Sequence, residues 1–315
     1  MKRSAKWLDA AAILFFLLLA LVFFAPVLFG NQTLAPFDNL YRFPPWRAFA
    51  AQNGVTQAYN PLLDDLILEN YAWKSFINES LRAGELPLWN PYIFAGQPFL
   101  AAGQNAALYP LSVLFILLPL TAAYAAFAAL HYWLAACAMY FFARVLRLRP
   151  FAATVSGIIF AFGGFMVVSV VFPMVVSAAA WLPAILAFVQ FLAGHVEVSY
   201  YILLVLAFYA AWRILSANVA GRARTRHWRG SARAGAWVCG IVALGFALAA
   251  IQILPLYELV RLNFREGSAS YADVAGWALP SRQILTFFIP DFFGNPTHHA
   301  YFDIFDFAWK PAPQG

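Results

Sequence analysis

The chain has 315 residues, of which 63% are hydrophobic and 11% charged, and its formal net charge is +6. A soluble domain carries about 25% charged residues, so this composition excludes an ordinary soluble protein and indicates an integral membrane protein. The basic residues cluster beside apolar runs, where they act as topology signals, which argues against nucleic-acid binding. Cys137 and Cys239 both lie in apolar runs and predict buried thiols, not a disulfide or a metal site.

The first apolar run covers residues 10–29 and follows three basic residues. Its length suits a hydrocarbon core of about 30 Å, so we expect an uncleaved first transmembrane helix with its N-terminus in the cytoplasm. A signal peptide is the competing interpretation, although no small-residue cleavage site follows cleanly. Residues 30–109 are then expected to form one extracytoplasmic loop, within which 61–83 predicts an amphipathic interfacial helix.

The stretch 84–110 is too rich in proline and glycine to cross a bilayer, yet apolar segments flank it. Its five Trp, Tyr and Phe rings are of the kind that lie at a membrane–water boundary, and four Asn and Gln side chains add neutral hydrogen-bonding groups. Two interpretations stay open. The stretch is either an interfacial loop that wedges helix ends, or the wall of a pocket for a polar substrate, with Trp89, Asn90 and Gln104 as binding residues.

Further transmembrane helices are expected within 121–254. The apolar segments there lie at 121–143, 151–172, 174–193, 198–215 and 234–254. If each crosses once, the arginine-rich segment 216–233 lies outside, which contradicts the positive-inside rule. Either one segment does not cross or a helix is missing near Gln190, and we keep 216–233 in the cytoplasm. Of the acidic residues, only Asp9 is then near the cytoplasm, so any chemistry is expected on the outer side, which also holds 255–315.

The pattern as a whole predicts an all-α polytopic membrane protein with a single membrane domain over 1–315. Its loop GELPLWNPYIFAGQPFLAAGQNAALYP resembles the signature region of YfhO-type bacterial membrane proteins, which are relatives of the GT-C class of polytopic glycosyltransferases. Later blocks resemble family blocks in the same order: FAFGGFMV at 160–167, AAWLP at 179–183, AGHVEVSYYILL at 193–204, AAIQILPLYELV at 249–260 and LTFFIPDFFGNP at 285–296. Together these cover most of the chain.

Two departures from the family pattern matter. Members normally carry a further helix and a basic loop between the Trp-Leu-Pro block and the Gly-His block, whereas Trp181 to His195 runs on without them. The missing helix agrees with the topology conflict above. The chain also ends at Gly315, inside an expected outward loop, where the family continues for many more helices. The resemblance therefore predicts a shortened or truncated member.

The resemblance implies a GT-C-like helical bundle in the bacterial cytoplasmic membrane. Such an enzyme transfers a sugar from a polyprenyl-phosphate donor to an envelope polymer or glycolipid on the outer face. The implied partners are the lipid bilayer, the lipid-linked sugar and a glycan or glycolipid acceptor. The chemistry needs a carboxylate that deprotonates or orients the acceptor hydroxyl, and cationic or amide donors that hold the leaving phosphate.

Three carboxylates are the catalytic candidates. Asp38 lies just beyond the first helix, where GT-C proteins place their first-loop acid, and an Asx turn in a Pro-rich loop is its structural alternative. Asp64 and Asp65 begin the helix at 61–83, where the helix dipole alone favours negative charge. As a functional pair, with Asp65 ahead of Asp64, they would share the acid–base work or bind a divalent cation such as Mg²⁺ or Mn²⁺.

Five further residues are candidates for substrate binding. His195 and Glu197 lie near the expected outer end of a helix, where a histidine is more often a hydrogen-bonded structural group. Gln252, Glu258 and Arg261 lie at another outer helix end. An ionisable residue so close to the apolar region indicates a site unless it is paired. An i,i+3 ion pair between Glu258 and Arg261 is the structural alternative to a phosphate ligand.

Two other functions compete with sugar transfer. A transporter or flippase-like protein would handle the same lipid-linked sugars, but it would carry charged residues in mid-helix, and the expected helices carry almost none. A structural assembly subunit of the envelope glycan machinery would instead use the aromatic loop to dock a partner, through Trp89 and Tyr92.

Overall fold

The computed structural model describes residues 2–56, 60–93, 95–181, 204–205, 207–209, 211–212, 224–261, 284–285, 300–303 and 308–311. This part of the chain is mostly helical, with two short antiparallel hairpins. It divides into two compact units. Unit 1 comprises Met1–Leu34 and Lys74–Leu259, and unit 2 comprises Ala35–Trp73 and Val260–Gly315.

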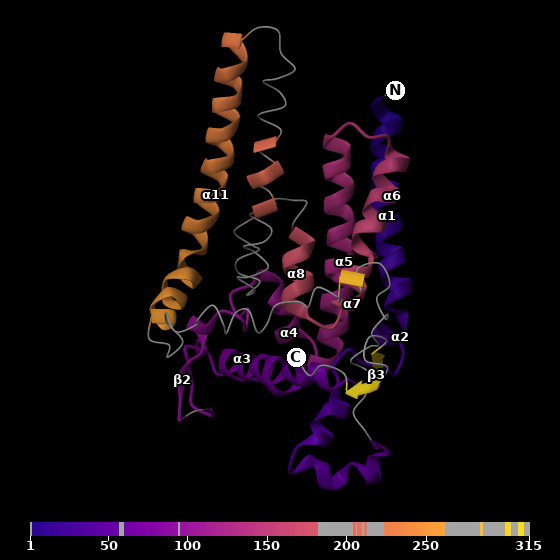
Figure 1. Cartoon of the computed structure of the whole chain (residues 1–315), viewed down its shortest axis with the longest axis vertical. Helices are drawn as coiled ribbons and strands as arrows, with labels where there is room; N and C mark the ends of the chain where they lie inside the picture. Colours follow the sequence, from indigo (N-terminus) through magenta and orange to yellow (C-terminus); the bar gives the residue numbers. More distant parts are fainter. Residues whose placement is uncertain are drawn as a thin grey trace. The chain divides into compact units, whose positions relative to one another are not determined.

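Unit 1 holds the long helices (Figure 1). Its helices are α1 (Lys2–Phe23), α2 (Ala25–Leu28), most of α3 (Ala72–Arg82), α4 (Leu114–Leu117), α5 (Leu120–Val145), α6 (Pro150–Ala161), α7 (Gly164–Val168), α8 (Pro173–Trp181) and nearly all of α11 (Arg224–Arg261). Two 3₁₀ turns, η6 (Leu100–Ala102) and η7 (Pro110–Val113), and the hairpin β1 (Trp89–Asn90) and β2 (Gln97–Pro98) complete it.

Three helices of the described chain are long and apolar enough to cross a membrane. They cover Lys6–Phe23, Leu120–Val145 and Pro150–Val168. A fourth crossing results if Gly235–Ala247 and Ala249–Arg261 count as one span, because these two segments of α11 are bent by 66° at the break between them. The described helices thus agree with a membrane protein.

Helix α5 is the centre of the bundle, since α1, α6 and α8 all pack against it. Its buried face is rich in alanine, and small side chains let neighbouring helices approach closely. The approach is tightest at Gly157 of α6, where an added Cβ would lie 2.7 Å from Cζ of Phe16 and 2.8 Å from the carbonyl oxygen of Ala136. Between these alanines, large side chains fill the core: Phe16, Phe24, Tyr132, Tyr140, Met166 and Val176.

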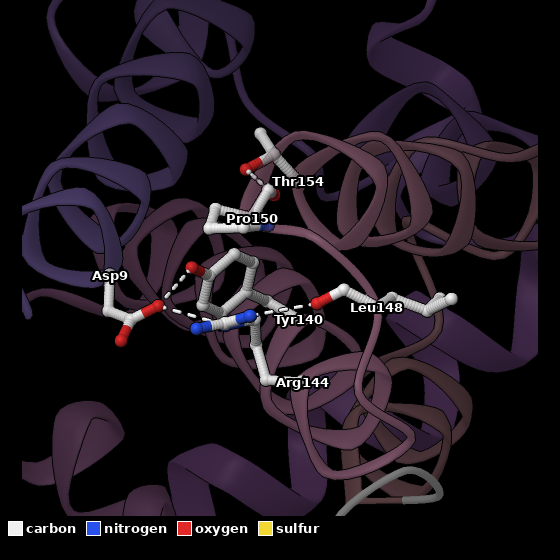
Figure 2. Close-up of polar contacts among 6 residues, drawn as sticks. All are labelled: Asp9, Tyr140, Arg144, Leu148, Pro150 and Thr154. Atoms are coloured by element: carbon white, nitrogen blue, oxygen red, sulfur yellow. Dashed lines mark hydrogen bonds and ion pairs between the residues drawn. The ribbon is translucent and has the colours of Figure 1, made fainter. Parts of the chain in front are cut away.

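A polar cluster joins α1 to α5 at one end of the bundle (Figure 2). The Asp9 carboxylate accepts a hydrogen bond of 2.5 Å from the Tyr140 hydroxyl and one of 3.0 Å from Nε of Arg144. Arg144 also donates through Nη1 to the Leu148 carbonyl at 2.8 Å, which ties down the turn that follows α5. The acidic side chain that the sequence places near the cytoplasm is therefore paired with a cation.

The ends of several predicted helices differ from the structure. Helix α1 stops at Phe23 instead of 29, because Pro26 has no N–H to continue the ladder, and the short α2 follows. The crossing expected at 151–172 breaks after Ala161 and covers 150–168. Residues 224–233, expected in a loop, are the first turns of α11, as the good helix propensity of arginine allows. Most of 174–193 and 198–215 lies outside the described residues.

Unit 2 consists of short turns, and its elements are η1 (Phe37–Arg42), η2 (Trp46–Phe49), η3 (Ala51–Asn53), η4 (Pro61–Leu63), the π-helical η5 (Leu66–Tyr71), β3 (Ala300–Asp303) and β4 (Ala308–Pro311). Strands β3 and β4 pair antiparallel, with Tyr301 opposite Lys310. The helix predicted at 61–83 is present as η4, η5 and α3 in succession. Helix α3 runs crosswise to the long helices in Figure 1.

Candidate functional site

The loop 84–110 begins with a hairpin whose turn needs glycine. Strands β1 and β2 pair with Asn90 opposite Gln97, and the Phe99 N–H extends the pairing to the Leu88 carbonyl at 2.8 Å. Gly96 has a φ of +106°, and an added Cβ would lie 2.5 Å from Nε1 of Trp89. The Trp89 ring thus lies against the bare glycine backbone and fixes the hairpin from one side.

Side chains from several elements satisfy the carbonyl groups of this loop. Because the loop has little regular structure, its main-chain acceptors need other donors. The Phe99 carbonyl accepts from Nδ2 of Asn105 at 2.6 Å, and the Ala106 carbonyl accepts from the Ser112 hydroxyl at 2.8 Å. The Leu100 carbonyl accepts from Nε2 of Gln252 at 2.9 Å. The loop is therefore held in its shape by the side chains of Asn105, Ser112 and Gln252.

The contact between Gln252 and the loop joins two segments that are far apart in the sequence. Gln252 is only 5% exposed, and an added Cβ at Gly103 would lie 3.3 Å from its Nε2. Gly103 has a φ of +79°, so glycine suits this position for both space and backbone conformation. The loop 84–110 and the segment 249–260 thus touch each other within unit 1.

Lys74 of α3 is the buried cation of this region. Its side chain is 3% exposed, and Nζ donates to the Asn105 carbonyl at 2.7 Å. The ammonium also lies 4.8 Å from the centre of the Phe115 ring, within the range of a cation–π contact. Burial lowers the pKa of Lys74 from 10.5 to about 7, because the apolar surroundings disfavour the charged form. Within the described residues it forms no ion pair.

A second buried network fixes the end of the loop against α5 and α8. Nδ1 of His131 lies 2.7 Å from the Phe127 carbonyl, which can only accept, so Nδ1 carries the proton. Nε2 then accepts from the Tyr109 hydroxyl at 2.6 Å, and that hydroxyl accepts from Nε1 of Trp181 at 2.8 Å. Burial raises the pKa of Tyr109, and the hydrogen bond from Trp181 lowers it by less. The neutral tautomer of His131 with its proton on Nδ1 thus gives hydrogen-bond partners to both ring nitrogens, and the Tyr109 hydroxyl both donates and accepts.

The three catalytic candidates all belong to unit 2. Arg42, the last residue of η1, forms an ion pair with Oδ2 of Asp64. Asn39 is one 3₁₀ turn earlier on the same face and donates to the Asn60 carbonyl at 2.8 Å. These two contacts connect η1, which carries Asp38, to the start of the helix at 61–83. Asp38 is half-buried and Asp65 is exposed.

This part of unit 2 also has acceptors without donors. Oδ1 of Asn39 and Oδ1 of Asp64 are both buried and find no hydrogen-bond partner among the residues that the structure describes. Burial and the charge of Asp65 raise the pKa of Glu69 in η5. Within the described ranges, no group of three or more His, Cys, Asp or Glu side chains could hold a metal ion. The guanidinium of Arg42 is the cation that pairs with Asp64 within the described residues.

The predicted binding residues are in different situations. Trp89 is 54% exposed, and Gln104 is exposed as well. Asn90 is buried, and its Oδ1 accepts from the Tyr92 N–H at 3.0 Å, which is an Asx turn that shapes the hairpin. Glu258 and Arg261 lie exposed at the end of α11, in unit 1 and unit 2 respectively. His195 and Glu197 lie outside the described residues.

Sequence reasoning missed Lys74, His131 and Trp181, although two of them carried a signal. His131 lies in the middle of a predicted transmembrane helix, where an ionisable residue indicates a polar network by default. Lys74 lies in the amphipathic helix predicted at 61–83, where charged residues are interleaved with apolar ones, and this pattern does not say which side chains become buried. Comparisons with known proteins found no matching family model, no similar curated protein and no similar solved structure.

Proposed function

We propose that this protein is a membrane glycosyltransferase that transfers a sugar from a polyprenyl-phosphate donor to an envelope polymer or glycolipid. The protein would lie in the bacterial cytoplasmic membrane and cross it several times. Its N-terminus would be in the cytoplasm, and the reaction would take place on the outer side. The apolar helices and the resemblance of the loop 84–110 to YfhO-type proteins support this proposal.

One observation carries the proposal furthest: the pair of Arg42 and Asp64 connects the segment of Asp38 to that of Asp65. In the proposed reaction the acceptor oxygen attacks the anomeric carbon, and Asp38 takes the hydroxyl proton. The bond from that carbon to the phosphate oxygen breaks, and its electron pair stays on the polyprenyl phosphate. Arg42, oriented by Asp64, would stabilise the charge that develops on this oxygen.

The test is native mass spectrometry of the protein extracted gently from its own membrane. A retained adduct with the mass of a polyprenyl-phosphate sugar, lost in Arg42→Gln, supports the donor site. Asp38→Asn is expected to keep the adduct and to abolish sugar transfer. Glu85→Gln is the matched control, because Glu85 is an exposed carboxylate in the other unit. Transfer that persists in Asp38→Asn removes this residue from the mechanism.

A second function has its own supporting observation. The side chains of Lys74, Asn90, Asn105 and Gln252 all hold the loop itself, whereas the aromatic side chain of Tyr92 is 77% exposed. A rigid loop with exposed rings suits a structural subunit that docks a protein partner. In that case Trp89→Ala and Tyr92→Ala would break a complex that copurifies with the wild-type protein and would leave lipid binding unchanged.

A further inference from the structure

The buried amine of Lys74 holds the most constrained part of the loop. Its acceptor, the carbonyl of Asn105, belongs to the residue that folds the segment 99–107 around itself. The Asn105 side chain donates to the Phe99 carbonyl at 2.6 Å and accepts from the Ala107 N–H at 3.0 Å. Asn105 is itself 1% exposed, so the contact with Lys74 lies inside the fold.

The charged form of Lys74 has fewer hydrogen-bond acceptors than donors at this buried position. An ammonium has three N–H groups, and within the described residues it finds one carbonyl acceptor and the face of Phe115. A neutral amine needs less, because one of its two N–H groups already makes the bond to Asn105. Water can reach the ammonium only if the segment 99–107 or α3 moves away.

We propose that the protonation state of Lys74 controls whether the loop segment 99–107 opens. The neutral amine holds this segment closed, and the protonated ammonium lets it open. The proposal does not depend on sugar transfer. It concerns how firmly the loop is held, whatever the loop binds.

The direction of the effect follows from linkage between proton binding and opening. The pKa of Lys74 is about 7 in the closed loop and 10.5 once hydrated. Between these two values, opening takes up a proton, so the closed state becomes more stable as the pH rises. Below pH 7 both states are protonated, and the dependence disappears. From pH 9 to pH 7 the opening constant is expected to rise by about 50-fold.

Other ionisable groups on the surrounding elements do not take over this role. Among the described residues, they are Glu69 and Tyr71 on η5, Glu79 and Arg82 on α3, Glu85, Tyr92 and Tyr109 in the loop, and Tyr124, His131, Tyr132, Cys137, Tyr140 and Arg144 on α5. Turn η7 and helix α4 carry none. Burial alone lowers the pKa of Lys74, with no contribution from a neighbouring charge.

Hydrogen exchange measures the proposed opening directly. The amides of Ala102, Ala106 and Ala107 are hydrogen-bonded in the closed loop, and mass spectrometry of the peptide that contains them reports their protection. After correction for intrinsic exchange rates, the wild-type protein should open about 50-fold more often at pH 7 than at pH 9. Lys74→Met, which cannot take a proton, should show equal protection at both pH values.

Two further variants keep the outcome unambiguous. Lys74→Gln retains a donor for the Asn105 carbonyl and serves if the methionine variant does not fold. Lys6→Met removes an exposed lysine on α1 and should keep the wild-type pH dependence. The proposal is overturned by equal pH dependence in wild type and Lys74→Gln, or by wild-type protection that rises as the pH falls.

Discussion

Replacing Tyr109 by phenylalanine tests the buried network at the end of the loop. The change removes a single oxygen and leaves the ring in place. It leaves the Nε2 acceptor of the buried His131 and the Nε1 donor of the half-buried Trp181 without this partner, and these atoms now lie 2.6 Å and 2.8 Å from that oxygen. A fully buried unsatisfied group costs about 1–3 kcal/mol and a half-buried one costs less, so we expect a loss of about 2–5 kcal/mol in the free energy of unfolding.

Thermal unfolding in detergent, followed by size-exclusion chromatography, is the assay. A loss of that size should lower the apparent Tm by roughly 2–4 °C for each kcal/mol. Tyr92→Phe is the control, because Tyr92 is 77% exposed in the same loop. This control should leave the Tm unchanged.

A double variant separates the network from simple packing. If Tyr109→Phe is combined with Trp181→Phe, the orphaned indole donor disappears, so the combined loss should be smaller than the sum of the two single losses. Strict additivity, or a Tm for Tyr109→Phe equal to that of wild type, would refute the hydrogen-bonded network.

Three other predictions concern packing and charge. Gly157→Leu places atoms against a ring of α1 and a carbonyl of α5, so it should cost about 1–3 kcal/mol, whereas Gly157→Ser should cost less; equal Tm values would contradict the tight contact. Asp9→Asn and Arg144→Met should each lower the Tm and show a coupling of about 1 kcal/mol in a double-mutant cycle, and a coupling of zero would argue against the ion pair. Gly96→Ala should displace Trp89 and shift its fluorescence, while an unchanged spectrum would mean that the ring does not lie on the glycine.

Much of the fold could be predicted where local chemistry decides it. Helix α5 agrees with the predicted segment 121–143 to within two residues, because Pro119 precedes it, the residues up to Ala143 are almost all apolar, and a basic turn and Pro150 follow. The break after Ala161 was not predicted, since the mean hydropathy of the run 151–172 gives no indication of a bend, although Gly163 and Gly164 lie at the break.

The candidate site was predictable only in part, because its contacts join distant residues. The importance of the loop 84–110 could be inferred from its prolines, glycines and aromatic rings. The hydrogen bond from Gln252 to the Leu100 carbonyl could not be predicted, because 152 positions separate the two residues and neither of them alone indicates its partner. Lys74 shows the same limit, because helical periodicity locates a residue on a face but does not say what covers that face.

The ion pair between α1 and α5 has a consequence for how the chain is made. Asp9 and Arg144 are 135 positions apart, so the ribosome synthesises the carboxylate long before its partner. The Trp133 N–H, which bonds to the Ile13 carbonyl, arrives similarly late. Helix α1 is therefore made before the cation that pairs with its acid, and the packing of α1 on α5 can form only after α5 has followed.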